Sequence, residues 1–380
     1  MLHILNCVKD DKFIDDLIEV LDASSDSVVH DFVIFSEVKE YNYHNVHTTS
    51  RINVISSKEF LPLLSTNKYD AVVLHSLTSI PVQLIIDIPI DMSVFWFSWG
   101  YDIYSMPYYR PFVKIKLYHA LTNKFIKGNI LNRIRLVHAF IDSYLNRKII
   151  QKAVNRIDYY SGVIPIEYDL MKKNKFFRAD KVEFNYFSLN SYINEENIEE
   201  PIVYSNSIMI GNSCYPTNNH LDIFEYLYEN NLNSYKIYSF LSYGGMKEYT
   251  DEVKKVGKKY FGDKFVPIEE FLPFDKFREI TMSCGNVIMP QERQQAMGNI
   301  YLSLWNGCKV FFSETSVTYK FLKSMGFKIY TIQHDLTDSV INTNISKNDI
   351  LNNRKLEVKY LSSEVCMKRI HDIYRMLELK

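Results

Sequence analysis

The clearest structural pattern in the sequence is NVIMPQERQQAMGNIYLSLWNGCKVFF, which covers residues 286–312. Its two ends, residues 286–289 and 309–312, are short apolar runs of the kind that form fully buried strands. Between these ends, residues 294–305 have the length and the apolar content of a helix. Strand, helix and strand in this order predict a βαβ unit, whose two strands lie parallel in one sheet.

The same rhythm continues on both sides of this unit, from Ser207 to Tyr330. It predicts a parallel sheet with helices on both faces. A last amphipathic helix is expected at about residues 362–379. We expect further strands at residues 207–210, 236–241, 264–266 and 328–330, and further helices at residues 218–228, 247–260, 273–282 and 316–325.

A second α/β region precedes residue 190. Residues 190–201, NSYINEENIEEP, contain four glutamates and little apolar content, which is typical of a linker. We therefore predict two doubly wound, Rossmann-like α/β domains at residues 1–190 and 202–355, joined by an acidic linker at residues 191–201, with ligand sites at the strand ends. The expected strands of the first domain are residues 2–6, 28–35, 71–74, 93–97 and 157–161, with a helix at residues 11–21.

The 380 residues include 44 Lys and Arg, 45 Asp and Glu, and 47% hydrophobic residues. This length and composition suit two domains with cores of their own, and they exclude a disordered chain or a disulfide-stapled miniprotein. A signal peptide and a membrane-spanning helix are not expected, because the first apolar run is short and the long uncharged stretch at residues 71–86 contains several polar residues. The cysteines, which predict a reduced compartment and no zinc site, are scattered at positions 7, 214, 284, 308 and 366.

Charge is unevenly distributed along the chain. Between Tyr101 and Tyr160 there are 11 basic and three acidic residues, a local excess of eight in a chain whose net charge is -1. Helical spacing in residues 108–155, with a break near Gly128 and Asn129, makes this region a basic helical insertion. We expect it to dock on an anionic membrane surface. A solvated helical face or a nucleic-acid patch would also explain the charge.

The loop after residues 207–210 predicts a phosphate site. Gly211 frees the backbone, and Asn218 is of the type that caps a helix whose first amides stay unpaired. Such a helix start attracts a diphosphate through its N–H groups and its positive dipole end. An ordinary capped loop explains the segment equally well. The candidate donor-binding residues are Gly211, Asn212, Ser213 and Asn218, with Tyr243 and Gly244 after the next strand, where a simple turn is the alternative.

Polar side chains also follow the strand at residues 286–289. Arg293 can bind a phosphate through two parallel hydrogen bonds, and Gln294, Gln295 and Asn299 can bind ribose or sugar hydroxyls. The alternative is a solvated helix start. Because the sequence has no Asp-x-Asp and no His-Glu-x-x-His, we expect no metal, and Arg293 and the helix start would neutralise the diphosphate instead.

The segment WGYDIY, residues 99–104, follows the strand at residues 93–97. Asp102 is the candidate general base, with Trp99 and Tyr101 beside it to contact an acceptor sugar. A loop aspartate that caps the next element is the alternative. His75 is a second candidate base that would also contact the acceptor, and Glu167 is a weaker one.

These segments resemble glycosyltransferase family 56, the 4-alpha-L-fucosyltransferase family. Its members move N-acetylfucosamine, or 4-acetamido-4,6-dideoxygalactose, from a dTDP-sugar onto a lipid-linked saccharide in enterobacterial common antigen synthesis. The sequence departs from the family pattern at Cys214 and Tyr215, where a small and an acidic residue are expected, and at Ala296, where Gly is expected. The matching motifs are Trp99 to Tyr104, Gly211-Asn212-Ser213 with Asn218-Asn219-His220, and Arg293-Gln294-Gln295 with Gly298.

The resemblance implies a GT-B architecture, in which two Rossmann-like domains face a cleft. It also implies an inverting hexosyl transfer that needs no metal or other cofactor, with a dTDP-sugar as donor and a lipid-linked or oligosaccharide acceptor. The protein would lie on the inner face of the bacterial cytoplasmic membrane, and the last helix, within residues 356–380, would pack back on the first domain. A nucleotide-sugar epimerase or hydrolase of the same architecture, or a non-catalytic scaffold of a polysaccharide assembly complex, are the alternatives.

Overall fold

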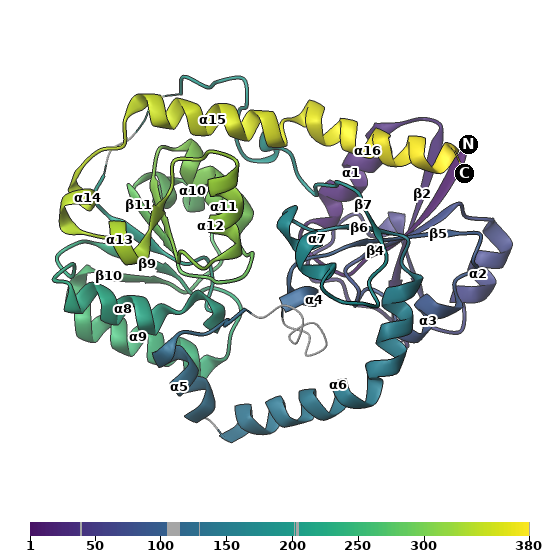
Figure 1. Cartoon of the computed structure of the whole chain (residues 1–380), viewed down its shortest axis with the longest axis horizontal. Coiled ribbons are helices and arrows are strands. Elements are labelled where there is room, and N and C mark those ends of the chain that lie inside the picture. The colour runs from purple at the N-terminus through teal and green to yellow at the C-terminus, as the bar shows by residue number, and fades with distance from the viewer. Residues whose placement is uncertain (39, 105–114, 129, 201, 203–204, 380) are drawn as a thin grey trace. The chain divides into compact units, whose positions relative to one another are not determined.

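The computed structural model describes residues 1–38, 40–104, 115–128, 130–200, 202 and 205–379 (Figure 1). Three predictions fall partly outside these residues. They concern residues 108–114 of the basic insertion, Asn129 at the predicted helix break, and Pro201 at the end of the predicted linker.

The chain divides into two compact units. Unit 1 contains Met1–Lys114, His138–Ser191 and Leu361–Lys380, and unit 2 contains Ile115–Val137 and Tyr192–Tyr360. The division differs from the predicted one inside the basic insertion, because residues 115–137 cluster with unit 2 and not with the N-terminal region that precedes them.

Unit 1 is built on a parallel sheet whose strand order is β3-β2-β1-β4-β5-β6-β7. The order reverses beside β1, since β2 and β4 pair with its two edges. Ligands bind at such switch points, outside the carboxyl ends of the strands. The strands are β1 (Leu2–Cys7), β2 (Val28–Phe35), β3 (Ile52–Ile55), β4 (Ala71–His75), β5 (Ser93–Phe97), β6 (Tyr159–Ser161) and β7 (Asp180–Lys181), of which β3 and β7 were not predicted.

The last helix belongs to unit 1. In α16 (Ser363–Glu378), the Tyr374 hydroxyl lies 2.6 Å from the Ser24 hydroxyl and 2.8 Å from Nε2 of His30. Ile370 and Ile373 are part of the core that covers one face of the sheet. The other helices of unit 1 are α1 (Ile14–Ser24), α2 (Phe60–Asn67), α3 (Val82–Asp87), α4 (Tyr101–Tyr104) and α7 (Ile166–Met171), with single 3-10 turns at Thr49–Arg51 and Leu189–Ser191.

Unit 2 has a parallel sheet of order β10-β9-β8-β11-β12-β13, which reverses beside β8. The predicted α/β domains with doubly wound sheets are therefore confirmed. Figure 1 shows α8 and α9 on one face of this sheet and α11 and α12 on the other. The strands are β8 (Ile208–Ile210), β9 (Ile237–Phe240), β10 (Phe265–Ile268), β11 (Asn286–Met289), β12 (Lys309–Phe312) and β13 (Tyr330–Thr331).

Two helices of unit 2 start later than predicted. Residues 216–218 form a 3-10 turn and Asn219 has a φ of 47°, so α8 begins at His220 and not at Asn218. The helix expected from Gln294 begins at Met297, which leaves residues 291–295 in a loop. The helices are α8 (His220–Glu229), α9 (Lys247–Phe261), α10 (Phe274–Met282), α11 (Met297–Trp305), α12 (Val317–Ser324), α13 (Ile332–Asp335), α14 (Asp338–Asn342) and α15 (Lys347–Leu361), with 3-10 turns at Pro216–Asn218 and Gly262–Lys264.

A helix from the first half of the sequence packs within unit 2. The Asp222 carboxylate of α8 accepts hydrogen bonds from the backbone N–H groups of Leu121 and Thr122, at 2.8 and 3.0 Å, and from the Thr122 hydroxyl at 2.6 Å. These bonds satisfy amides at the start of α5 (Ala120–Gly128), which otherwise have no partner within the helix. The next helix is α6 (Ile130–Arg156), and the predicted break near Gly128 and Asn129 is not tested because Asn129 lies outside the described residues.

Candidate functional site

In unit 2, the loops that follow β8 and β11 are joined by side-chain hydrogen bonds. The Gln295 amide donates to Oδ1 of Asn212 at 2.9 Å, and the Gln291 amide donates to Oδ1 of Asn218 at 2.6 Å. The Thr217 hydroxyl donates to Oε1 of Gln295 at 2.7 Å. The structure thus brings together the two segments from which most of the donor-binding residues were predicted.

Asn218 closes the loop that contains Gly211 and Ser213. Its side-chain amide donates to the Ser213 carbonyl oxygen at 2.8 Å and to the Ser213 hydroxyl at 3.1 Å, and both residues are fully buried. Gly211 has a φ of +65°, and a Cβ atom there would lie 2.8 Å from Oδ1 of Asn218. Asn218 and Ser213 therefore shape the loop, because their hydrogen bonds are made inside it.

Tyr243 and Gly244 lie at the same edge of the sheet. The Asn212 amide donates to the Tyr243 hydroxyl at 2.8 Å, and the Tyr243 side chain is exposed. Gly244 has a φ of +75°, and a Cβ atom at this position would lie 2.4 Å from the ring of Tyr215. Glycine is therefore required for Tyr215, one of the residues that depart from the family pattern, to pack here.

Arg293 and Ala296 lie where the loop after β11 meets α11. Arg293 is partly exposed and donates to the carbonyl oxygen of Gln294 at 3.2 Å. Ala296 caps α11 with a φ of +60°, a conformation that favours glycine, which is the residue expected here from the family pattern. Asn299 is partly exposed in the first turn of α11, whereas Gln294 is buried.

Glu292 also lies at this site, although it was not among the predicted site residues. Its Oε1 lies 2.8 Å from Nε2 of His119, and its Oε2 accepts from the Thr315 hydroxyl at 2.7 Å. Burial alone would raise the pKa of Glu292, but hydrogen bonds from His119, Ser313 and Thr315 lower it below its usual value. No local pattern could have shown this pair, because 173 positions separate His119 from Glu292.

In unit 1, Asp102 is fully buried at the start of α4. Its Oδ2 accepts from the backbone N–H of Leu77 at 3.0 Å and from the indole N–H of Trp96 at 2.9 Å, and its Oδ1 accepts from the backbone N–H of Trp99 at 3.0 Å. Burial raises its pKa more than these bonds lower it. The role of Asp102 as the general base stays a prediction, because catalytic hydrogen bonds often form only when the substrate is bound.

The other two candidate bases are also fully buried. His75 lies 2.9 Å from the Tyr186 hydroxyl through Nδ1 and 3.1 Å from Oδ1 of Asn6 through Nε2, and burial lowers its pKa to about 3. Oε2 of Glu167 accepts from the backbone N–H of Ile164 at 3.2 Å, and burial raises the pKa of Glu167 to about 7. Their roles in the reaction stay predictions.

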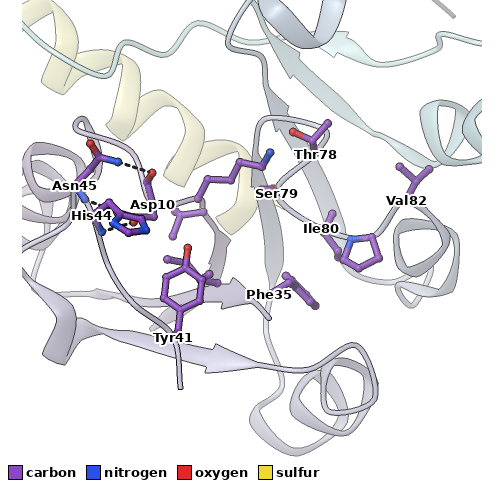
Figure 2. A pocket seen from close by; sticks show the side chains of 13 residues that line it. Asp10, Phe35, Tyr41, His44, Asn45, Thr78, Ser79, Ile80 and Val82 are labelled. Atoms are coloured by element: carbon purple, nitrogen blue, oxygen red, sulfur yellow. Dashed lines mark hydrogen bonds between the residues drawn. The ribbon is translucent and has the colours of Figure 1, made fainter. Parts of the chain in front are cut away.

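A pocket of about 670 Å³ lies at the switch point of the unit 1 sheet (Figure 2). The Asp10 carboxylate shapes one wall, since it accepts from the backbone N–H groups of His44, Asn45 and Val46 at 2.6 to 2.9 Å. The lining residues are Val8, Lys9 and Asp10 after β1, Ile34 and Phe35 of β2, Tyr41, His44 and Asn45 beyond it, and Thr78, Ser79, Ile80, Pro81 and Val82 after β4.

One of the predicted acceptor-binding residues, Tyr101, contacts the lining of this pocket. The Tyr101 hydroxyl contacts two lining residues, with distances of 2.5 Å to the Thr78 hydroxyl and 3.3 Å to Nζ of Lys9. Trp99 is partly exposed, and its ring centre lies 5.8 Å from that of Tyr186.

Among the residues that the structure describes, no group of three or more His, Cys, Asp or Glu side chains is arranged to hold a metal ion. No helix in the described part of the chain combines the length and apolar character needed to span a membrane. All five cysteines are buried and unbridged.

Two α/β units, each with a parallel sheet and with polar residues at the switch point of that sheet, define a GT-B protein. The fold is similar to that of sucrose-phosphate synthase from Thermosynechococcus elongatus, with a TM-score of 0.65, 9% identity and 100% of both chains covered. A glycosyltransferase from Rickettsia africae is similar at a TM-score of 0.62 and 12% identity over 99% of this chain and 98% of that one. HepE from Anabaena, which was solved with UDP and glucose, is similar at a TM-score of 0.59 and 10% identity over 99% of this chain and 100% of that one.

The family is shown by the sequence match. The model described as 4-alpha-L-fucosyltransferase, glycosyl transferase group 56, matches residues 126–364. The chain belongs to this family and is a glycosyltransferase. The match includes every predicted donor-binding residue but not Trp99, Tyr101 or Asp102. A comparison with curated protein sequences found no match to the chain.

Proposed function

We propose that this glycosyltransferase moves a 4-acetamido-4,6-dideoxyhexose from a dTDP-sugar to a lipid-linked saccharide in bacterial surface polysaccharide synthesis. The transfer inverts the anomeric carbon and uses no metal. The observation that carries the proposal is the hydrogen-bonded cluster after β8 and β11, which lies within the family match.

The donor diphosphate would lie against unit 2. Arg293 is a permanent cation beside the start of α11, whose first N–H groups favour an anion. Gly211 allows the backbone of the β8 loop to approach a ligand closely. Charge that develops on the leaving diphosphate would be stabilised by these groups, a contribution of a few kcal/mol. HepE, a protein of similar fold, was solved with UDP, which supports a nucleotide-sugar donor.

The acceptor saccharide would lie against unit 1. Its pocket combines apolar walls with the hydroxyl of Thr78 and the ammonium group of Lys9, which suits a sugar ring with its alternating apolar and polar faces. Tyr101 contacts both of these polar groups. The lipid would be held at the inner membrane surface by the basic region around α6.

Nucleotide binding tests the donor proposal. We expect dTDP to raise the thermal midpoint more than UDP, GDP or CMP, because a ligand of the folded state stabilises it by mass action. Arg293→Ala should weaken dTDP binding about 10- to 100-fold by calorimetry, as expected for a charge-assisted hydrogen bond. Arg375→Ala, at an exposed arginine of α16, is the matched control. Unchanged dTDP affinity in Arg293→Ala would remove this residue from the donor site.

A further inference from the structure

A residue of the basic insertion lies at the donor-binding cluster of unit 2. The backbone N–H of His119 donates to Oδ1 of Asn219 at 2.8 Å, and its ring nitrogen Nε2 lies 2.8 Å from Oε1 of Glu292. The side-chain amide of Asn219 donates in turn to the carbonyl oxygens of Thr217, at 3.1 Å, and Pro290, at 3.2 Å. His119 therefore lies where the loops that follow β8 and β11 meet, among the residues proposed to bind the donor.

The two ring nitrogens of His119 have different surroundings. Nε2 contacts Glu292, whereas Nδ1 makes no hydrogen bond to any residue that the structure describes. The side chain is 27% exposed and Nδ1 itself is not buried, so this nitrogen is open to a ligand. A carboxylate that holds one nitrogen of an imidazole fixes the orientation of the ring and leaves the other nitrogen for a substrate.

Glu292 is an ionised partner for this ring. Burial alone would raise the pKa of Glu292, but hydrogen bonds from His119, Ser313 and Thr315 lower it below its usual value, so the carboxylate is charged near neutral pH. Its side chain is only 8% exposed. A carboxylate with so little contact with water favours the positively charged form of an imidazole that it contacts. His119 is therefore suited to carry a positive charge at the donor site.

The charges around His119 leave room for an anion. Asp222 and Glu314 have partners of their own, which are the N–H groups at the start of α5 and the His334 ring. Each phosphate of a nucleotide sugar carries a negative charge, and Arg293 alone balances one of them. The charged groups on the segments around His119 are Glu292 and Arg293 after β11, Asp222 of α8, Glu314 after β12, and the exposed Lys116 and Lys124 of its own segment.

We propose that His119, as an imidazolium, binds the donor diphosphate through Nδ1–H together with Arg293, an assignment that rests on the proposed function and deepens it. Glu292 is then a positioning residue, which holds the ring through Nε2. During transfer the bond from the anomeric carbon to the diphosphate oxygen breaks, and its electron pair leaves with the nucleotide diphosphate. The proton of the acceptor hydroxyl passes to the general base, so His119 keeps its own proton and hydrogen-bonds to the departing diphosphate.

The test measures donor binding by calorimetry at several pH values in the absence of acceptor. The ligand is dTDP-4-acetamido-4,6-dideoxygalactose, because the diphosphate of a nucleotide sugar does not change charge near neutral pH. In the wild type, Kd should rise about tenfold between about pH 6 and 8.5, as the imidazolium loses its proton. His119→Gln keeps a donor for Glu292 but carries no charge, so its Kd should stay at the weaker value throughout.

Two further variants separate a positioning role from a structural one. Glu292→Gln removes the charge beside the ring, and the pH dependence of Kd should move to lower pH by about one unit. A purely structural role for Glu292 would not move it. His334→Gln is the matched control, because the exposed His334 forms the same kind of pair, with Nε2 3.2 Å from Oε2 of Glu314. Its pH dependence should equal that of the wild type.

The wild type alone gives a second measurement, which does not depend on how well a variant folds. Calorimetry in two buffers of different ionisation enthalpy should show that donor binding near neutral pH takes up protons. A wild-type Kd that did not change with pH, or a change that was equal in His119→Gln, would overturn the assignment. A wild type that bound no dTDP-sugar at any pH would show instead that the proposed donor is wrong, and the role of His119 would fall with it.

Discussion

Asp102 is fully buried and accepts three hydrogen bonds, so a substitution there should change the stability of the fold. Asp102→Asn replaces one carboxylate oxygen by an NH₂ group, which would face an N–H donor from Leu77, Trp96 or Trp99. We expect the free energy of unfolding to fall by about 1 to 3 kcal/mol, because a buried donor is left unpaired. Chemical denaturation checks this, with Asp16→Asn, at an exposed residue in the first turn of α1, expected to change stability by less than about 0.5 kcal/mol.

The same variant also tests the role of Asp102 in the reaction. If Asp102 is the general base, Asp102→Asn should lower kcat about 10²- to 10⁴-fold, and the residual activity should lose the acid limb of kcat/KM. Residual activity that keeps the acid limb would show that Asp102 acts by positioning the backbone of Trp99 and not as the base.

Among the elements, α6 presents an apolar stripe to solvent. Ile134, Val137, Ile141 and Leu145 lie at helical spacing and are 49%, 56%, 48% and 72% exposed. Basic residues accompany the stripe, including Arg147 and Lys148, which are exposed. The proposed contact with an anionic membrane would use this exposed apolar stripe and its basic neighbours.

Replacing Val137, Ile141 and Leu145 by Ser should therefore weaken binding to phosphatidylglycerol-containing vesicles about tenfold or more, since apolar burial drives insertion. Vesicle sedimentation measures this binding, and Ile90→Ser, at an exposed residue of unit 1, is the control. Arg147→Glu with Lys148→Glu should reduce the salt-sensitive part of binding. Equal binding of wild type and triple variant at every salt concentration would contradict a membrane role for α6.

At the scale of the whole molecule, three buried histidines predict that the stability of the folded protein falls at low pH. Burial lowers the pKa of His30 to about 4 and those of His75 and His220 to about 3, from an ordinary value of 6.5. Below pH 6.5 the unfolded chain binds protons that the folded chain does not, so stability is complete above that pH and falls as the pH is lowered toward 4. The slope of the free energy of unfolding against pH approaches roughly 1.4 kcal/mol per pH unit for each histidine.

Thermal unfolding of the full chain between pH 7.5 and 4.5 measures this loss. His220→Leu should make the dependence shallower, because the buried His220 ring has no hydrogen-bond partner among the described residues and leucine removes its titration. His138→Gln, at an exposed histidine, should leave the slope unchanged. A slope that stayed the same in His220→Leu would show that other groups cause the acid sensitivity.

The sequence by itself determined the α/β class, the switch-point loops and the strands at residues 286–289 and 309–312, because apolar runs and helical periodicity are local properties. It also predicted that the Gly211 and Arg293 segments lie at one edge of the sheet, since the carboxyl ends of parallel strands lie together. Only the tertiary structure decided that α5 belongs to unit 2, that Glu292 contacts His119, and that Asp102 is enclosed. Burial and hydrogen-bond partners depend on residues far apart in the chain, and no spacing along the sequence encodes them.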